Sequence, residues 1–163
     1  MNCEDLYEKC DINGESVYFT DQECKMLYTG HVEYYFNGIL CWEADIVNGI
    51  MEGLEKVYNN ETGELESVNE KKYNMSNGLS IEYYKNGKIK SISTNINNCL
   101  IDFYDYDENG NISATSFLDE KDIHYCLVKN KIPELREKYN LEKLNKEILK
   151  HGKSIEYGKL LYK

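Results

Sequence analysis

Arginine and proline are nearly absent from this sequence of 163 residues, which contains one of each. The planar guanidinium group, which binds phosphate and carboxylate through paired hydrogen bonds, is therefore supplied only by Arg136. Acidic residues number 29 against 19 basic ones, and the formal net charge of −10 repels phosphate. We expect no direct contact with nucleic acid.

Long apolar runs are also missing, and the stretch at residues 39–42 falls far short of the roughly 18 residues that a membrane helix needs. Residues 1–5 are acidic, whereas a secretory signal begins with basic residues followed by an apolar stretch. These absences predict a cytoplasmic protein without membrane contact.

Motifs for disulfides, metal sites and catalysis are absent too. No two of the six cysteines have the two-residue spacing of a zinc or redox motif, and in the cytoplasm we expect reduced thiols. His124 and Cys126 form the one close pair of potential ligands, too few for a metal site. His31 and His151 stand apart, without a nucleophile or metalloprotease motif. We predict neither an enzyme nor a cofactor.

What the sequence does contain is an internal repeat. Four segments share an aromatic stretch, a glycine turn and an aliphatic residue two positions after the glycine, with glycine spacings of 25, 24 and 23 residues. Asn-Gly favours the positive φ angles of tight hairpin turns, so each segment predicts a β-hairpin. Single hairpins are unstable in water, and we expect an antiparallel meander of stacked hairpins. The glycines are Gly38, Gly63, Gly87 and Gly110, and the aliphatic residues, expected to be buried equivalently, are Leu40, Leu65, Ile89 and Ile112.

Alternation within the repeats predicts one apolar and one polar, aromatic sheet face. Val32 and Tyr34 share the first face, as do Ile81 and Tyr83 in the third repeat. Another set of glycines is expected where one hairpin leads to the next. The outward residues are Glu33, Tyr35, Glu82 and Tyr84, and the connecting glycines are Gly30, Gly49, Gly53 and Gly78.

The succession of aromatic residues, Asn-Gly, an aliphatic residue and a second glycine, as in residues 34–49, resembles the MORN repeat family, especially its bacterial variant in antitoxin and immunity proteins. The resemblance covers about residues 28–118. The second copy inserts Glu61 and Thr62 in its turn, and the third replaces the closing glycine with Asn98. The resemblance implies a hairpin-repeat sheet that binds another protein.

Both ends depart from the repeat. Residues 12–30 resemble a degenerate hairpin that caps the array, with its turn at Asp21 and Gln22. Pro133 opens a predicted helix at 133–150, and residues 154–162 predict a last strand. Residues 1–128 carry a net charge of −15 and residues 129–163 a net charge of +5. We divide the chain there into an acidic repeat array and a basic part that packs on it.

Residues 105–116 match the first ligands and the glycine of an EF-hand calcium loop. Position twelve, however, is Ser116 instead of a bidentate glutamate, and neither flank predicts a helix. The hairpin repeat accounts for Gly110 without calcium, so no metal is expected here.

Together these features predict a binding module that neutralises a basic toxin, such as a nuclease, by masking its active surface. Alternatives are a scaffold or adaptor, the role that the resemblance to MORN arrays also implies, and a phage-encoded acidic inhibitor of a nucleic-acid enzyme. Tyrosines give large contact area at low entropy cost, although cross-strand support of the sheet would explain them equally well. The predicted partner-binding residues are Tyr35, Tyr84, Asp102, Asp105, Asp107 and Glu108.

Overall fold

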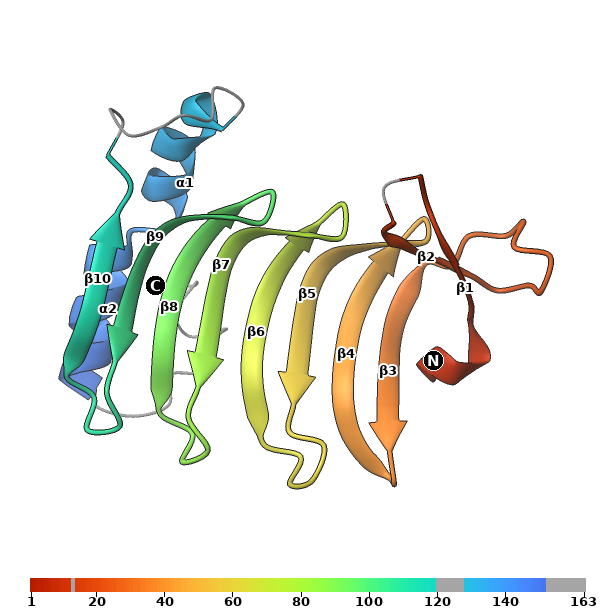
Figure 1. The fold of residues 1–163 in the computed structure, drawn as a ribbon, viewed down its shortest axis with the longest axis horizontal. Helices are drawn as coiled ribbons and strands as arrows, with labels where there is room; N and C mark the ends of the chain where they lie inside the picture. The colour runs from red at the N-terminus through yellow and green to blue at the C-terminus, as the bar shows by residue number, and fades with distance from the viewer. Residues whose placement is uncertain (13, 120–127, 152–163) are drawn as a thin grey trace. The chain divides into compact units, whose positions relative to one another are not determined.

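The central feature of the fold is an antiparallel sheet of eight strands that pair in the order in which they occur along the chain (Figure 1). The computed structural model describes residues 1–12, 14–119 and 128–151. The meander of hairpins predicted from the repeats is confirmed. Its strands are β3 (Gly30–Phe36), β4 (Ile39–Val47), β5 (Ile50–Tyr58), β6 (Leu65–Lys72), β7 (Met75–Tyr83), β8 (Ile89–Ile96), β9 (Cys99–Tyr106) and β10 (Ile112–Phe117).

Each of the four predicted glycines lies in a hairpin turn with positive φ. The first turn has two such residues, Asn37 at 51° and Gly38 at 79°, as the sequence predicted. In the other three, only the glycine has positive φ, at 72° to 89°, and the loops are longer. A longer loop with one left-handed glycine shifts the register of the strands that it joins.

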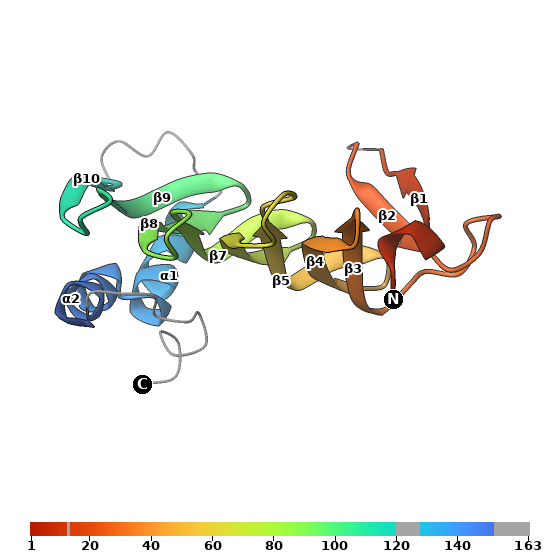
Figure 2. The same ribbon diagram turned by 90° about the horizontal axis from the view of Figure 1, so that it is seen from below.

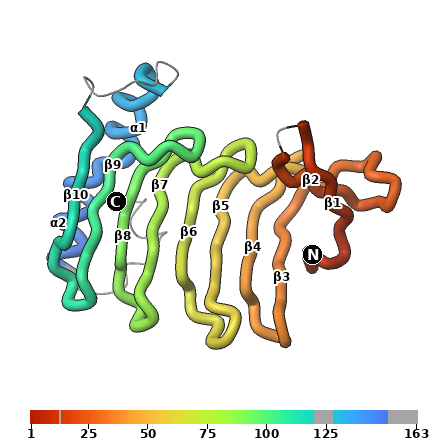
Figure 3. Tube along the Cα trace, viewed as in Figure 1, coloured from red at the N-terminus to blue at the C-terminus, as the bar shows by residue number. Residues whose placement is uncertain are grey.

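Figure 3 shows the turns that lead from one hairpin to the next. Asparagine occurs in them more often than glycine. Successive positive φ angles occur at Asn48 and Gly49, at Tyr73 and Asn74, and at Asn97 and Asn98, since asparagine tolerates this region better than other side chains. Of the predicted connecting glycines only Gly49 is in such a turn, which corrects the prediction for the others. Gly30 begins β3, and Gly53 and Gly78 lie within β5 and β7.

Two of these asparagines also bond to the strand that follows the preceding connecting turn. Asn74 Oδ1 accepts a hydrogen bond from Met51 N at 2.6 Å, and Met51 O accepts one from Asn74 N at 3.0 Å. Asn98 and Ser76 repeat the arrangement, with a distance of 2.7 Å from Ser76 N to Asn98 Oδ1. The connecting turns are thus part of the repeat.

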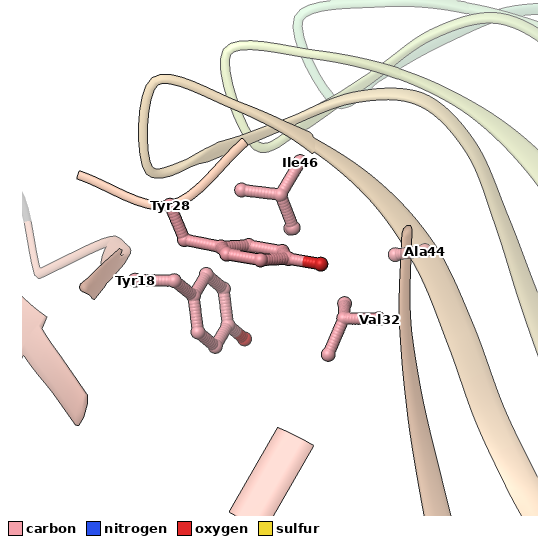
Figure 4. Packing of buried hydrophobic residues seen from close by; sticks show 5 residues of the cluster. All are labelled: Tyr18, Tyr28, Val32, Ala44 and Ile46. Atoms are coloured by element: carbon pink, nitrogen blue, oxygen red, sulfur yellow. The ribbon is translucent and has the colours of Figure 1, made fainter. Parts of the chain in front are cut away.

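The chain forms two compact units, an N-terminal unit, Met1–Met75, and a C-terminal unit, Ser76–Lys163. The division predicted at residue 128 separates regions of different charge and stays a prediction. Figure 4 shows the N-terminal core, where the rings of Tyr18 and Tyr28 lie beside Val32, Ala44 and Ile46. All five side chains are less than a tenth exposed.

The cap of the N-terminal unit differs in part from the degenerate hairpin predicted at residues 12–30. Strand β2 (Ser16–Phe19) pairs with β1 (Tyr7–Cys10), which the sequence analysis missed, and η1 (Cys3–Asp5) precedes both. Residues 26–28 make only a single bridge, between Phe19 and Leu27. Around the predicted turn, the carboxylate of Asp21 accepts hydrogen bonds from Lys25 N and Met26 N.

The prediction that the four aliphatic repeat residues are equally buried is wrong. Ile89 is 5% exposed, Leu40 and Leu65 are half-buried, and Ile112 is 42% exposed. Leu40 pairs with Tyr35 in the first hairpin, whereas Ile89 pairs with Tyr83 in the third. This shift of one residue places Leu40 on the opposite sheet face.

In the C-terminal unit, both helices lie on one side of β8 and β9 (Figure 2). They are α1 (Ile132–Lys138), preceded by η2 (Lys129–Lys131), and α2 (Leu141–His151), so the helical structure predicted at 133–150 is confirmed but is divided into two helices. The break occurs because Tyr139 has non-helical backbone angles and Asn140 Oδ1 accepts a hydrogen bond from Lys143 N, capping α2. The predicted strand at 154–162 lies outside the described residues.

Candidate functional site

The polar face of β3, β4 and β5 gathers a connected group of titratable side chains. On β3, His31 and Glu33 alternate with buried residues, and on β4 Glu43 and Asp45 do the same. Antiparallel pairing places His31 opposite Asp45 and Glu33 opposite Glu43. We call this group the His31 cluster: His31, Glu33, Tyr35, Glu43, Asp45, Lys56 and Tyr58.

Glu43 is the centre of the cluster, and its side chain is only 12% exposed. Its Oε1 atom accepts hydrogen bonds from Lys56 Nζ at 2.6 Å and Tyr58 OH at 2.7 Å. Its Oε2 atom lies 3.0 Å from His31 Nε2. Burial by itself would raise the pKa of Glu43, but the hydrogen bonds from Lys56, Tyr58 and His31 hold it below its usual value.

His31 has a carboxylate at each ring nitrogen. Its Nδ1 atom is 2.9 Å from Asp45 Oδ1, and Nε2 faces Glu43. The hydrogen bond to Asp45, against a smaller opposing effect of burial and with further help from Glu43, raises the pKa of His31. With its side chain 45% exposed, the imidazole is open to solvent and to ligands.

Tyr35 and Tyr84, predicted as equivalent binding residues, have different environments. Tyr35 is 40% exposed and donates a hydrogen bond to Glu33 Oε2 at 3.1 Å. Tyr84 is partly buried and donates to Tyr106 O at 2.7 Å, which supports the sheet from within the same unit. Tyr35 is therefore the better placed of the two for contact with a partner.

Of the four acidic residues predicted to form a binding surface at the fourth hairpin, only three are accessible there. Asp105 and Asp107 are partly exposed and Glu108 is exposed. Asp102, in contrast, is 1% exposed and its carboxylate is bound by Arg136, which corrects its assignment as a partner-binding residue. The sequence alone did not reveal that Asp102 is buried, because its cationic partner, Arg136, lies 34 residues away.

The calcium-like loop is a β-hairpin turn between β9 and β10. Asp107 Oδ1 accepts hydrogen bonds from Asn109 N and Asn111 N, at 2.9 and 2.8 Å. Hydrogen bonding to Asn111, first through its side chain and then through its backbone, lowers the pKa of Asp107. The carboxylate therefore holds the turn together.

Charge is distributed unevenly between the two units. Residues 1–75 contain 16 acidic residues and five lysines, a formal net charge of −11. Residues 76–163 contain 13 acidic and 14 basic residues, a net charge of +1. The negative charge thus belongs mainly to the unit that holds the His31 cluster. At the acidic turn of the other unit, Lys88 Nζ donates a hydrogen bond of 2.7 Å to the backbone carbonyl of Glu108.

Sequence reasoning missed the His31 cluster because His31 was weighed alone. The signal was present: alternate polar residues, His31 with Glu33 and Glu43 with Asp45, flank the turn at Asn37 and Gly38. Folding the hairpin about that turn places the two pairs opposite each other. His124 and Cys126, the other pair considered, lie outside the described residues.

No family model matches this chain, and no curated protein matches it either. Over the described ranges, none of the helices has the length and apolar character needed to cross a membrane.

Proposed function

We propose that this chain is a cytoplasmic protein-binding module of the antitoxin or immunity type, which neutralises a basic toxin, such as a nuclease, by covering its active surface. The observation that carries the proposal is the net charge of −11 on residues 1–75. A strongly negative surface attracts a positively charged partner and speeds its association.

The hydrogen-bonded hairpins of the N-terminal unit suit this role, since a preorganised surface loses little conformational entropy on binding. Tyr35 and Phe36 extend from the end of β3 with 40% and 48% of their surface exposed. Large aromatic side chains of this kind provide much of the binding energy in many interfaces. In the proposed complex these two residues act as anchors, and the surrounding acidic residues guide the encounter.

The decisive experiment begins with the genes that neighbour this one. A neighbouring toxin is produced with and without this chain, and we expect co-production to restore growth and the two proteins to form a stable complex. Growth that stays arrested, or purified proteins that do not associate, would refute the proposed function.

Association kinetics with that partner then test the electrostatic argument. Neutralising the exposed Glu61, Glu64 and Glu66 to glutamine should lower the association rate more than it raises the dissociation rate. The same change at Asp105, Asp107 and Glu108, to the matching amides, should have a smaller effect, because the C-terminal unit has a net charge of only +1. An association rate that ignores salt between ~50 and ~500 mM, where the screening length shortens severalfold, would contradict this argument.

Tyr35→Ala tests the anchor and Tyr84→Ala is its control. The first should raise the dissociation rate with little change in association, because a packed side chain acts after encounter. The second should leave binding nearly unchanged in the fraction that remains folded, since the Tyr84 hydroxyl bonds to Tyr106 O within its own unit. Equal effects of the two substitutions on dissociation would argue against Tyr35 as an anchor.

A further inference from the structure

We propose that His31, Glu33 and Glu43 form a site for a divalent transition-metal ion, with Zn²⁺ as the preferred ion. One ligand atom from each residue lies within 4.8 Å of the other two. An imidazole nitrogen together with carboxylate oxygens is a ligand set that suits zinc, whereas calcium and magnesium favour oxygen ligands alone. This site is independent of the proposed protein partner.

The geometry needs only a small adjustment of side chains. Tetrahedral zinc, with metal–ligand distances of about 2.0 to 2.2 Å, holds its ligand atoms about 3.3 Å apart. His31 Nε2 and Glu43 Oε2 are already 3.0 Å apart. Glu33 stands directly across the strand pair from Glu43, so rotation of its partly buried side chain, away from the Tyr35 hydroxyl, can complete the set. A water molecule or an outside ligand would take the fourth position.

Asp45 supplies the support that metal-binding histidines usually have. Its Oδ1 atom is 2.9 Å from His31 Nδ1, the ring nitrogen that the proposed metal does not use. A carboxylate at that position fixes the tautomer, with the proton on Nδ1 and the lone pair on Nε2. Asp45 is itself held, because Leu54 N donates a hydrogen bond to its Oδ2 atom at 3.2 Å.

The charges favour a dication. Like charges that face each other across a strand pair are destabilising, and Glu33 and Glu43 face each other in this way. With neutral His31, the carboxylates of Glu33, Glu43 and Asp45 and the ammonium of Lys56 give the group a net charge of −2. Zn²⁺ would balance this charge by binding the lone pair of Nε2, and any proton that His31 carries on Nε2 is released to solvent when the ion binds.

The fold does not require these residues. In hairpin β7–β8, Glu82 occupies the repeat position of Glu33 but pairs with Ser91 in place of a second glutamate. Ser80 stands there at the position of His31. The corresponding antiparallel strand pair therefore forms without the ligand set, which indicates that the set serves a purpose other than folding.

The test is titration of the full, chelator-treated chain with ZnCl₂ by calorimetry, and with CoCl₂ by visible absorption. We expect one ion per chain and a cobalt spectrum without thiolate charge-transfer bands. His31→Ala, Glu33→Gln and Glu43→Gln should each weaken zinc binding about tenfold or more. Asp45→Asn should also weaken it, by about tenfold, since it leaves the three ligands in place and changes only their support.

Glu82→Gln is the matched control, because it changes the corresponding glutamate of another hairpin and should not alter zinc affinity. Circular dichroism checks that each variant is folded. His31→Ala should keep the fold, because the side chain that it removes is 45% exposed. The site is refuted if His31→Ala binds zinc as well as the original chain, if thiolate bands dominate the cobalt spectrum, or if millimolar zinc produces no binding.

Discussion

Arg136 on α1 donates two hydrogen bonds of 2.8 Å to the buried carboxylate of Asp102 on β9. A third bond of 2.7 Å runs from Arg136 Nη2 to Leu118 O, and Leu118 N in turn donates to Asp102 Oδ1. The one arginine of the chain thus joins a helix, a strand and the segment after β10. Paired bonds of this kind depend on the planar guanidinium, which lysine cannot replace.

Arg136→Met should therefore reduce the free energy of unfolding by about 3 kcal/mol or more, because Asp102 would be left as a buried, uncompensated charge. Urea denaturation followed by circular dichroism measures this change. Adding Asp102→Asn to the same chain should recover part of the loss.

Lys90→Met is the control for that prediction. Lys90 pairs with Glu82 at 2.8 Å, but both side chains are about half exposed, so its loss should cost at most about 1 kcal/mol. Similar costs for Lys90→Met and Arg136→Met would show that the buried pair has no special role.

Ile89→Ala and Ile112→Ala should differ, although the two residues hold the same repeat position. Ile89 is 5% exposed and its truncation should cost about 2 to 4 kcal/mol, since it leaves a cavity. Truncation of Ile112, which is 42% exposed on edge strand β10, should lower the free energy of unfolding by about 0.5 kcal/mol. Chemical denaturation of both variants tests this, and equal losses would contradict the difference in burial between the two residues.

Asn98 combines a left-handed backbone, with φ of 64°, and a side-chain bond to Ser76 N. Asn98→Gly should keep the turn and lose only that bond, whereas Asn98→Ala should lose both advantages. We expect the alanine variant to be the less stable of the two by about 1 kcal/mol. Thermal or urea unfolding compares the two variants, and an alanine variant at least as stable as the glycine variant would show that this backbone position carries no strain.

Tyr18 makes the N-terminal unit sensitive to alkali. Burial, with a smaller effect of Glu8, raises the pKa of Tyr18 to about 12, from an ordinary value of about 10. A raised folded-state pKa means that the neutral form is favoured in the folded chain. Its stabilisation is fully present below about pH 10 and is lost as the pH rises toward about 12.

Tyr18→Phe should accordingly flatten the decline of unfolding free energy between about pH 10 and 12, measured by urea denaturation at a series of pH values. Tyr73→Phe, at a tyrosine that is 57% exposed, should leave the decline unchanged. A decline that is as steep in Tyr18→Phe as in the original chain would assign the effect to other tyrosines.

Local sequence determined the repeat. The turns at Gly38, Gly63, Gly87 and Gly110 were predictable because left-handed backbone angles favour glycine wherever the turn occurs. The alternation of Val32 with Glu33 was likewise readable, since the side chains of a strand point to opposite faces whatever lies beyond it. Hairpin order followed from short connections between neighbouring repeats.

Tertiary structure decided everything that depends on distant residues or on exact register. A shift of one residue placed Leu40 and Ile89 on different faces, and the cap at Asn140 divided the helix. The sequence predicted Asp102 as part of an acidic binding surface, but in the structure its carboxylate binds Arg136. The His31 cluster exists only because pairing of β3 with β4 sets its histidine and carboxylates side by side, a contact that depends on the whole hairpin.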